Sequence, residues 1–395
     1  MPQIFHIKVA ILFFTLIFLV FHSYILYPIL LWLFDANKKP AYTVFSSSDN
    51  LPVVSIIMAA HNEEQVLEQK IASIMQTHYP VDKFEVIVGS DCSVDRTNEI
   101  LQQAANTYPS LSFINFEQRQ GKVAIMNNLV DRAIGDILIS TDANVLFDES
   151  TIFELVKYFK DDSIGLVDSR MVNKGLKRTG ISIQESAYIT HEVMIKYREG
   201  ALWGAMMGPF GGCYAIRKEC FTKPPRNFLV DDFFINMKVL GKGKKCINSL
   251  SALATEDVSN EISQEFKRKV RIAMGNFQNL KEFKNLLWPL HTPVAFAFLS
   301  HKVIRWFGPL IMLFAFVISV LLSFSSYFFK IIVAIQIGII LLALVDVFLK
   351  SIKIHILPLR FATHFLTMNL ALLVGLIKYF KGAQSNVWQP TQRNQ

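Results

Sequence analysis

Two polar side chains follow a short apolar run in the segment DILISTDANVLFD, residues 136–148. Residues 137–139 are typical of a buried strand, and Asp142 and Asn144 come at its end with one residue between them. Carboxylate and amide oxygens are ligands that a hard divalent cation prefers. Because Asp and Asn also favour turns, the pattern predicts either a cation site or a polar turn at this strand end.

A pair of neighbouring acids lies among apolar residues in the segment FLVDDFF. Burial of Asp232 beside Asp231 would raise one of the two pKa values, a property of a general base at neutral pH. The same two carboxylates would also stabilise the first turn of a helix over FFINMKVL, and both interpretations stay open. Gly211 and Gly212 precede this pair, where the lack of a side chain allows either close approach to the backbone or a turn.

Two basic positions are candidates for phosphate binding. Lys122 follows Gly121 at the start of an expected helix, where the helix dipole favours an anion over a cation. The position predicts either a phosphate-binding lysine or an ordinary solvated one. Arg271 belongs to the segment EFKRKVRIAMG, residues 265–275, which predicts a basic amphipathic helix. Taken alone, such a helix is most often a membrane-surface element.

The elements that would position these side chains alternate between strands and helices. This rhythm predicts a mainly parallel sheet with helices on both faces, a Rossmann-like α/β fold. Ligands of such sheets lie beyond the carboxyl ends of the strands, so Asp91 and Asp142 are expected to share one crevice. Asn62 and Glu63 lie at the first strand end, with Asn62 as the expected N-cap of a helix. The expected strands are 53–60, 84–91, 111–116 and 136–142, and the expected helices are 62–76, 94–104 and 121–134.

The composition indicates a membrane portion beside this soluble one. Of 395 residues, 52% are hydrophobic and only 18% are charged, and the mean hydropathy is +0.33. The nearly uncharged stretch from Val9 to Phe34 is long enough to span a hydrocarbon core of ~30 Å. A second apolar region, residues 288–380, predicts an interfacial helix (288–308), two spans (309–325 and 329–349) and a segment, 361–380, that either spans or lies in the interface. The expected domains are an anchor (1–36), a soluble domain (37–286), interfacial and transmembrane helices (287–384) and a tail (385–395).

The distribution of charge predicts a cytoplasmic location for the soluble domain. Lysines 38 and 39 follow the first span, and Lys281, Lys284, Lys302 and Arg305 precede the later ones, as the positive-inside rule requires. The four cysteines fall in the soluble domain without a C-x-x-C pair, which fits free thiols in a reducing compartment. The net charge of +8 is attributed to this bias and to a phosphate site, because no nucleic-acid-binding motif is present.

Seven motifs occur in the order seen in membrane-bound family 2 glycosyltransferases, which have a GT-A fold. They are MAAHNEE, VGSDCSVDRT, QGKVAIMNN, STDANVLFD, GPFGGCYAIRKE, VDDFF and RKVRIAMG, and the resemblance covers about residues 51–280. The flanking spans and the tail segment VWQPTQR are also similar to these enzymes. The tail carries Trp388 and Arg393, which could reach the soluble domain or serve as an interfacial anchor.

The resemblance implies a role for each candidate residue. Asp142 and Asn144 would hold Mg²⁺ or Mn²⁺, although the family usually has a second Asp at position 144. Asp232 would be the catalytic base, with Asp231 where the family usually has Glu. Gly211, Gly212 and Asp231 would bind the acceptor. The nucleotide sugar would be bound by Asn62, Glu63, Asp91, Lys122, Asp142 and Arg271.

Three further positions depart from the family pattern. Ser90 replaces the first of two consecutive acids that often end the second strand. Arg268 and Ile272 replace the glutamine and the tryptophan of a Gln-x-x-Arg-Trp motif, of which Arg271 supplies the arginine. The missing tryptophan counts against processive synthesis of the cellulose type.

The resemblance implies a membrane-embedded, inverting glycosyltransferase. It would move a sugar from a nucleotide sugar, expected to be a UDP-sugar, to a lipid-linked or growing polysaccharide acceptor during envelope glycan assembly. The expected location is a bacterial inner membrane. The alternatives are a synthase that polymerises and translocates a glycan, and a non-catalytic membrane scaffold that binds a nucleotide sugar. Sugar nucleotidyltransferases are disfavoured, because MAAHNEE lacks a glycine-rich basic loop.

Overall fold

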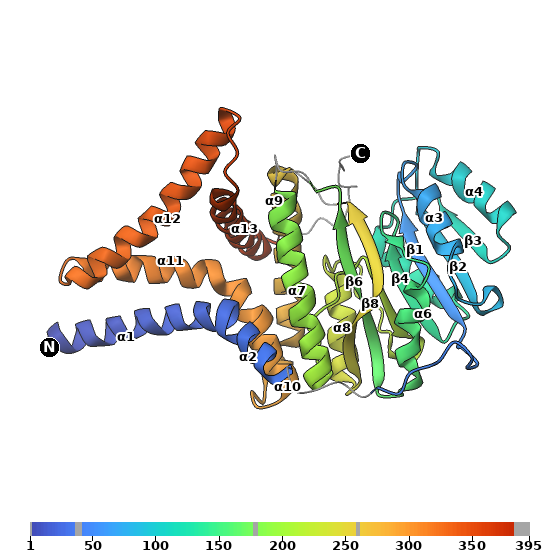
Figure 1. The fold of residues 1–395 in the computed structure, drawn as a ribbon, viewed down its shortest axis with the longest axis horizontal. Helices are drawn as coiled ribbons and strands as arrows, with labels where there is room; N and C mark the ends of the chain where they lie inside the picture. The colour runs from blue at the N-terminus through green and yellow to red at the C-terminus, as the bar shows by residue number, and fades with distance from the viewer. Residues whose placement is uncertain (1, 36–41, 177–180, 258–260, 383–395) are drawn as a thin grey trace. The chain divides into compact units, whose positions relative to one another are not determined.

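The computed structural model describes residues 2–35, 42–176, 181–257 and 261–382. These residues divide into two compact units (Figure 1). The sheet unit holds residues 34–35, 42–175 and 186–257, and the helical unit holds the remaining described residues. All described strands belong to the sheet unit.

The first half of the sheet is parallel, as the alternating pattern predicts. Among the described residues, one eight-stranded sheet has the order β3-β2-β1-β4-β7-β6-β8-β5. Central β1 pairs in parallel with β2 on one side and β4 on the other, so Asp91 and Asp142 end the two strands that flank it. The strands here are β1 (Val54–Ala60), β2 (Phe84–Asp91), β3 (Leu111–Phe116) and β4 (Ile137–Asp142), and the helices are α3 (Leu67–Met75), α4 (Thr97–Thr107) and α5 (Lys122–Arg132).

The second half of the sheet mixes strand directions. β7 (Cys213–Arg217) is antiparallel to both β4 and β6 (Ile164–Lys174). β8 (Lys245–Asp257) is parallel to β6, and the short β5 (Leu146–Phe147) is antiparallel to β8. The sheet is therefore Rossmann-like only in its first half. The remaining helices of this region are α6 (Thr151–Val156), α7 (Ser182–Trp203), whose first turn belongs to the helical unit, and α8 (Asp231–Gly241).

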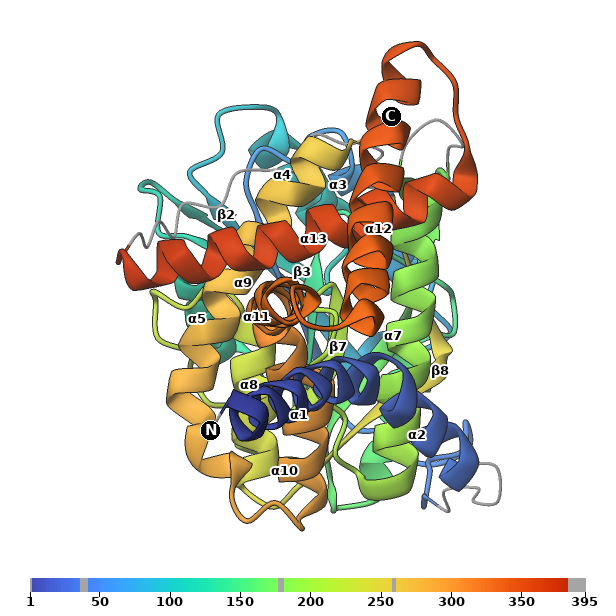
Figure 2. The ribbon, with the colours of Figure 1, turned by 90° about the vertical axis from the view of Figure 1, so that its left-hand side faces the viewer.

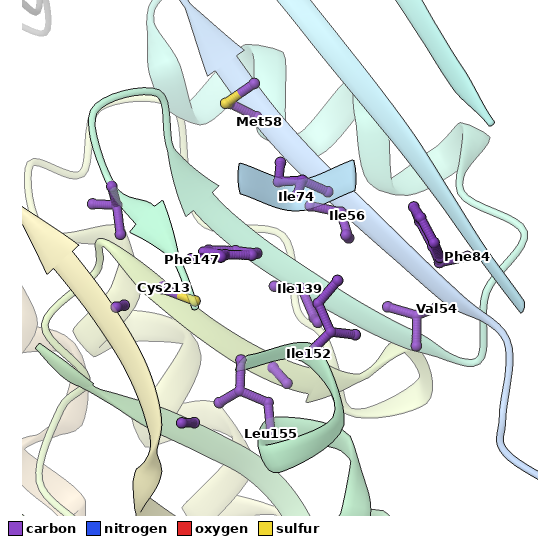
Figure 3. Packing of buried hydrophobic residues seen from close by; sticks show 14 of the residues in the cluster. Val54, Ile56, Met58, Ile74, Phe84, Ile139, Phe147, Ile152, Leu155 and Cys213 are labelled. Carbon is purple, nitrogen blue, oxygen red and sulfur yellow. The ribbon is translucent and has the colours of Figure 1, made fainter. Parts of the chain in front are cut away.

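The core of the sheet unit is formed by alternate residues of the strands. Val54, Ile56 and Met58 of β1 are fully buried in one cluster with Ile74 of α3 (Figure 3). Ile57, which points to the opposite face, is also buried. Strands that are apolar on both faces are typical of a parallel sheet covered by helices on both sides.

The first helix begins later than the sequence predicts. Asn62 is not an N-cap, because α3 starts only at Leu67. Asn62 instead takes a left-handed conformation with φ of 54°, and its Oδ1 accepts a hydrogen bond from the backbone N–H of Val94 at 2.9 Å. An asparagine tolerates this backbone better than most residues do. Asn62 thus ties the end of β1 to the loop that follows β2.

Four described helices of the chain are long and apolar enough to cross a membrane. They run through Ile4–Asp35, Pro293–Ser323, Tyr327–Ser351 and Leu357–Phe380. The first comprises α1 (Pro2–Phe21), a π-helical stretch and α2 (Tyr27–Asp35), and the second comprises α10 (Pro293–Ala297), a π-helical stretch and α11 (Ile304–Ser323). The other two are α12 (Tyr327–Ser351) and α13 (Leu357–Phe380).

The helices of the helical unit are held by apolar and ionic contacts. Phe13 of α1 packs edge-to-face on Phe329 of α12, with ring centroids 5.3 Å apart. Helix α13 contacts α9 (Ile262–Phe283) (Figure 2). A side chain in place of Gly375 would overlap Ala273. A buried ion pair joins Arg360 of α13 to Asp346 of α12 at 3.2 Å. This last contact pairs two charges that would be costly to bury alone.

The helix expected over residues 288–308, which leads into the next span, begins later than the sequence predicts. The helix begins at Pro293, where Thr292 caps it by accepting a hydrogen bond from the backbone N–H of Ala295. It then continues through Pro309 to Ser323 without a break. Long apolar helices tolerate an internal proline where neighbouring elements satisfy the freed backbone groups. Residues 38, 39, 388 and 393, to which the sequence assigns roles, lie outside the described residues.

Candidate active site

The polar end of β4 lies next to Gly211 and Gly212, which lead into β7 and are called the glycine segment below. The backbone N–H of Asp142 donates to the carbonyl of Gly212 at 3.0 Å, which continues the antiparallel pairing of Thr141 with Cys213. The Oγ1 of Thr141 donates to the same carbonyl at 3.1 Å. Asp142, the candidate cation ligand, and the glycine segment, the candidate acceptor site, are therefore direct neighbours across the sheet.

The glycine segment in turn lies against the candidate base. Gly211 has a φ of +78°, and a side chain at this position would overlap the Oδ2 of Asp232. Both the backbone conformation and the closeness of the carboxylate therefore require glycine here. Chain segments that are distant in sequence bring Asp142, Gly211 and Asp232 to one place.

Asp232 has the electrostatic surroundings of a general base. It lies in the first turn of α8, where its Oδ1 accepts a hydrogen bond from the backbone N–H of Phe233 at 2.7 Å. Burial and next the charge of Asp231 raise the pKa of Asp232 to about 7, against the opposing effects of that hydrogen bond and of Lys122. The two interpretations of this acidic pair are compatible: the carboxylates begin a helix, and one of them titrates near neutrality.

Lys122 faces the acids rather than open solvent. Its Nζ donates to the Oδ1 of Asp142 at 2.5 Å. Burial opposes the charge of Lys122, but Asp142, followed by Asp231 and Asp232, raises the pKa of this lysine above its usual value. The residue is a fixed cation at the start of α5, in the field of three carboxylates.

Asp91 organises the turn that precedes Lys122. Its carboxylate accepts hydrogen bonds from the backbone N–H groups of Gln120 at 2.7 Å and Gly121 at 3.0 Å, and it pairs with Arg119 at 3.3 Å. Asp91 does not cap α4, because Asp95 accepts the hydrogen bond from the backbone N–H of Thr97 instead. The buried carboxylate of Asp91 thus sets the backbone from which Lys122 extends.

Glu63 and Arg271, two further candidates for binding the nucleotide sugar, belong to different units of the structure. Glu63 is buried in the loop that follows β1, and its backbone N–H donates to the Oγ1 of Thr97 at 2.9 Å. Arg271 is an exposed residue of α9, which belongs to the helical unit. Its phosphate-binding role stays a prediction.

Three buried side chains that the sequence analysis missed hold the backbone before the glycine segment. The Oε2 of Glu199 accepts from the backbone N–H of Met207 at 3.0 Å, and the Oδ1 of Asn236 accepts from that of Gly208 at 3.1 Å. The Nζ of Lys196 lies 3.5 Å from the ring centroid of Phe210. These contacts fix residues 207–210 from α7 and α8.

Lys70 is a further residue that the sequence analysis missed. Its Nζ is fully buried, donates to the Oγ1 of Thr141 at 2.8 Å and to the carbonyl of Val145, and lies 3.6 Å from the ring centroid of Phe147. It holds both ends of the Asp142–Asn144 turn. The sequence contains an indication of this role, because the helical spacing places Lys70 on the same apolar face of α3 as Leu67, Ile71 and Ile74.

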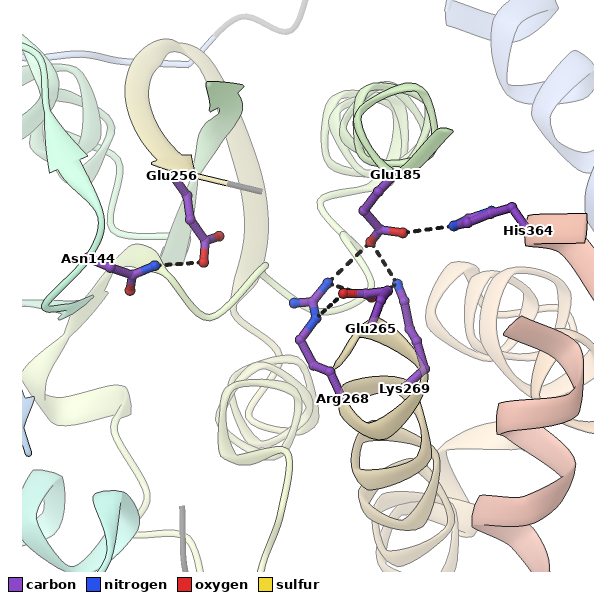
Figure 4. Close-up of polar contacts among 7 residues, drawn as sticks. All are labelled: Asn144, Glu185, Glu256, Glu265, Arg268, Lys269 and His364. Carbon is purple, nitrogen blue, oxygen red and sulfur yellow. Dashed lines mark hydrogen bonds and ion pairs between the residues drawn. The ribbon is translucent and has the colours of Figure 1, made fainter. Parts of the chain in front are cut away.

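The residues at this turn fit a hard divalent cation in type. Asp142 offers a carboxylate, and Asn144 offers an amide oxygen because its Nδ2 is engaged with the Oε1 of Glu256 at 2.8 Å (Figure 4). Within the described residues no three His, Cys, Asp or Glu side chains form a ready cation cage. A site with so few protein ligands is typical of Mg²⁺, whose coordination is completed by water and by the phosphates of a substrate.

A second polar cluster lies in the helical unit. Glu185 of α7 is buried and pairs with Lys269 at 2.9 Å and Arg268 at 3.2 Å, both from α9, and with His364 of α13 at 3.2 Å (Figure 4). Arg268 and Lys269 also pair with Glu265. Part of the basic character of α9 is therefore neutralised within the helical unit.

The chain is similar to known glycosyltransferases in sequence and in fold. The model for glycosyl transferase family 2 matches residues 55–223, and that for glycosyl transferase family group 2 matches residues 177–349. The mannosyltransferase PcManGT from Pyrobaculum calidifontis, solved with GDP-Man and Mn²⁺, has a TM-score of 0.71 at 21% identity, covering 94% of this chain and 100% of that one. This likeness shows the GT-A fold. Together the two models span residues 55–349, and this part of the chain belongs to the family 2 glycosyltransferases.

Among curated relatives, the poly-β-1,6-N-acetyl-D-glucosamine synthase of Staphylococcus aureus is 22% identical over 252 residues. The match covers 62% of this chain and 59% of the relative. The β-monoglucosyldiacylglycerol synthase of Nostoc sp. is 26% identical over 168 residues, which are 42% of this chain and 36% of the relative. Relatives with polysaccharide and with glycolipid products are both represented.

Proposed function

We propose that this glycosyltransferase moves a sugar from a nucleotide sugar to a hydroxyl of a lipid-linked or growing glycan acceptor, with inversion at the anomeric carbon. The observation that carries the proposal is the closeness of Asp142, Gly211 and Asp232 at one edge of the sheet. A carboxylate with a pKa near 7 beside a glycine segment is suited to accept a proton from a sugar hydroxyl. Both relatives above make glycans or glycolipids.

The reaction would be a single displacement. The acceptor oxygen attacks the anomeric carbon while the bond from that carbon to the diphosphate oxygen breaks, and the nucleoside diphosphate leaves with the bonding electrons. The proton of the acceptor hydroxyl passes to the carboxylate of Asp232. Attack from the face opposite the leaving group produces the inversion.

The donor would lie along the carboxyl ends of β1, β2 and β4. Asn62, Glu63 and Asp91 would contact the nucleoside, and Lys122 and Arg271 the diphosphate. Asp142 and Asn144 would hold Mg²⁺ or Mn²⁺. A divalent cation at this place offsets the charge that develops on the leaving diphosphate.

The four long apolar helices support a location in a membrane, with the sheet unit on the cytoplasmic side of a bacterial inner membrane. Nucleotide sugars are charged and would enter the site of the sheet unit from the cytoplasm. The acceptor would enter it from the membrane. The runner-up is a processive synthase, which the similarity to a polysaccharide synthase favours.

Turnover of nucleotide sugars by the detergent-purified chain tests the proposal. A panel of UDP- and GDP-sugars would be incubated with membrane lipid extract, with and without Mg²⁺ or Mn²⁺. Release of nucleotide from one donor, lost on chelation and in Asp142→Ala but kept in Asp131→Asn, an exposed acid of α5, is the expected result. A ladder of products would favour the processive alternative. Binding of the panel without any turnover would contradict the proposal and favour a non-catalytic scaffold.

A further inference from the structure

An acid from a distant strand stands beside the cation-binding turn. Glu256 lies at the carboxyl end of β8, one residue beyond the pairing of Leu146 with Thr255. Glu256 itself pairs with Asn173 of the parallel strand β6, which fixes its backbone within the sheet. The sheet therefore brings Glu256 to the turn that Asp142 and Asn144 form, although more than a hundred residues separate them in the sequence.

The hydrogen bond between Asn144 and Glu256 determines which way the amide faces. A carboxylate accepts hydrogen bonds and cannot donate one when ionised, so it must meet the Nδ2 of the amide rather than its oxygen. The distance is 2.8 Å, which is typical of a hydrogen bond to a charged acceptor. Figure 4 shows the amide oxygen of Asn144 turned away from Glu256. The oxygen is thus the atom that Asn144 presents to another partner.

The charges at the turn give Glu256 a second effect. Asp142 is the single acid of the turn itself, and Lys122 pairs with it at 2.5 Å. The positive charge of Lys122 opposes binding of a divalent cation at Asp142. A further negative charge on Glu256, one hydrogen bond removed from the amide ligand, makes the site more favourable for the cation without occupying a coordination position.

We propose that Glu256 is a positioning residue of the cation site, which holds the Asn144 amide with its oxygen toward the cation and adds negative charge beside it. This inference rests on the proposed function and deepens it, because it assumes that Asp142 and Asn144 hold a divalent cation. It assigns a role to a residue outside the motifs that mark the family in this sequence.

Binding of Mn²⁺ to the full-length, detergent-purified chain tests the inference without any turnover. The signal of free Mn²⁺ would be followed by electron paramagnetic resonance in titrations with Mn²⁺ alone and with UDP or GDP, against protein-free blanks. Glu256→Gln should weaken binding about 10- to 100-fold, because the new side chain no longer fixes the amide or carries charge. The matched control is Asp257→Asn, which removes the same charge from the next, exposed residue and should bind like the wild type.

An exchange of the two side chains separates positioning from structural damage. In Asn144→Asp combined with Glu256→Gln, the carboxylate and the amide trade places, so binding of Mn²⁺ should return close to that of the wild type. Equal binding by wild type and Glu256→Gln would overturn the inference and leave the proposed function intact, provided that Asp142→Ala still loses the cation. Failure of the exchanged pair to recover would also overturn it, because the loss would then be structural. If the wild type binds no Mn²⁺, or Asp142→Ala binds it unchanged, both the proposed cation site and the role of Glu256 are contradicted.

Discussion

The two carboxylates that begin α8 are adjacent in sequence, yet we assign them different tasks. Asp232 touches the glycine segment and has a pKa raised to about 7, first by burial and next by Asp231. Asp231 thus acts on its neighbour through charge. A base of this kind is competent only when deprotonated, so transfer should increase as the pH rises through about 7.

Asp231→Asn tests this coupling. Removal of the neighbouring negative charge takes away an effect that raises the pKa of Asp232, so the acidic limb of the kcat/KM profile should move to lower pH. The profile would be measured between pH 5 and 9 with a saturating cation. A limb that stays in place, or moves to higher pH, would show that the titrating group is not Asp232.

Lys122 is expected to bind the diphosphate of the donor. Lys122→Gln should weaken binding of nucleoside diphosphate about 10-fold or more, because a hydrogen bond to a charged group is worth about 1.5–3 kcal/mol. Calorimetric titration would measure the affinity at low and high salt. Lys223→Gln, which changes an exposed lysine of the same unit, serves as the control and should have no effect. Equal affinities for both variants would exclude Lys122 from the donor site.

At the scale of elements, the strand ends were predictable from the sequence because the rule behind them is local. A buried apolar run followed by an acid identifies β2 and β4, and their parallel pairing on either side of β1 brings Asp91 and Asp142 to the same edge. The later start of α3 was not predictable, because it depends on the left-handed backbone of Asn62. Glu256 was missed for another reason: its place beside Asn144 follows from the pairing of β5 with β8, which no local pattern indicates.

The segment that carries Gly211 depends on a buried ion pair between two other elements. Lys196 of α7 donates to Asp168 of β6 at 2.7 Å, and both side chains are almost fully buried. Lys196→Met should therefore destabilise the chain by about 3–5 kcal/mol, because Asp168 is left as a buried charge without its partner. The thermal melting midpoint in detergent would measure this loss.

The double variant Asp168→Leu with Lys196→Met provides the control for that prediction. Replacement of both charges by apolar side chains removes the penalty of the unpaired one, so much of the stability should return. If the double variant is less stable than Lys196→Met, the ion pair is not the source of the loss.

At the scale of the whole molecule, the natural cysteines provide a test of sidedness. Cys92 is partly exposed in the sheet unit, whereas Cys213, Cys220 and Cys246 are buried. A membrane-impermeant maleimide should therefore label the native chain in inside-out vesicles and not in intact cells. Cys92→Ser should abolish the labelling and so identifies the reactive thiol. Labelling from outside intact cells would contradict the cytoplasmic location of the sheet unit.

In the proposed reaction, Asp232 performs the chemistry and does not merely help to bind the donor. The most direct test compares wild type with Asp232→Asn in one preparation, where transfer from the active nucleotide sugar and affinity for its nucleoside diphosphate are both measured. We expect nearly unchanged affinity and a transfer rate lower by about 10²- to 10⁴-fold, the usual contribution of a general base. A variant that transfers at close to the wild-type rate would contradict the account, and so would one that loses activity only because it no longer binds the nucleotide.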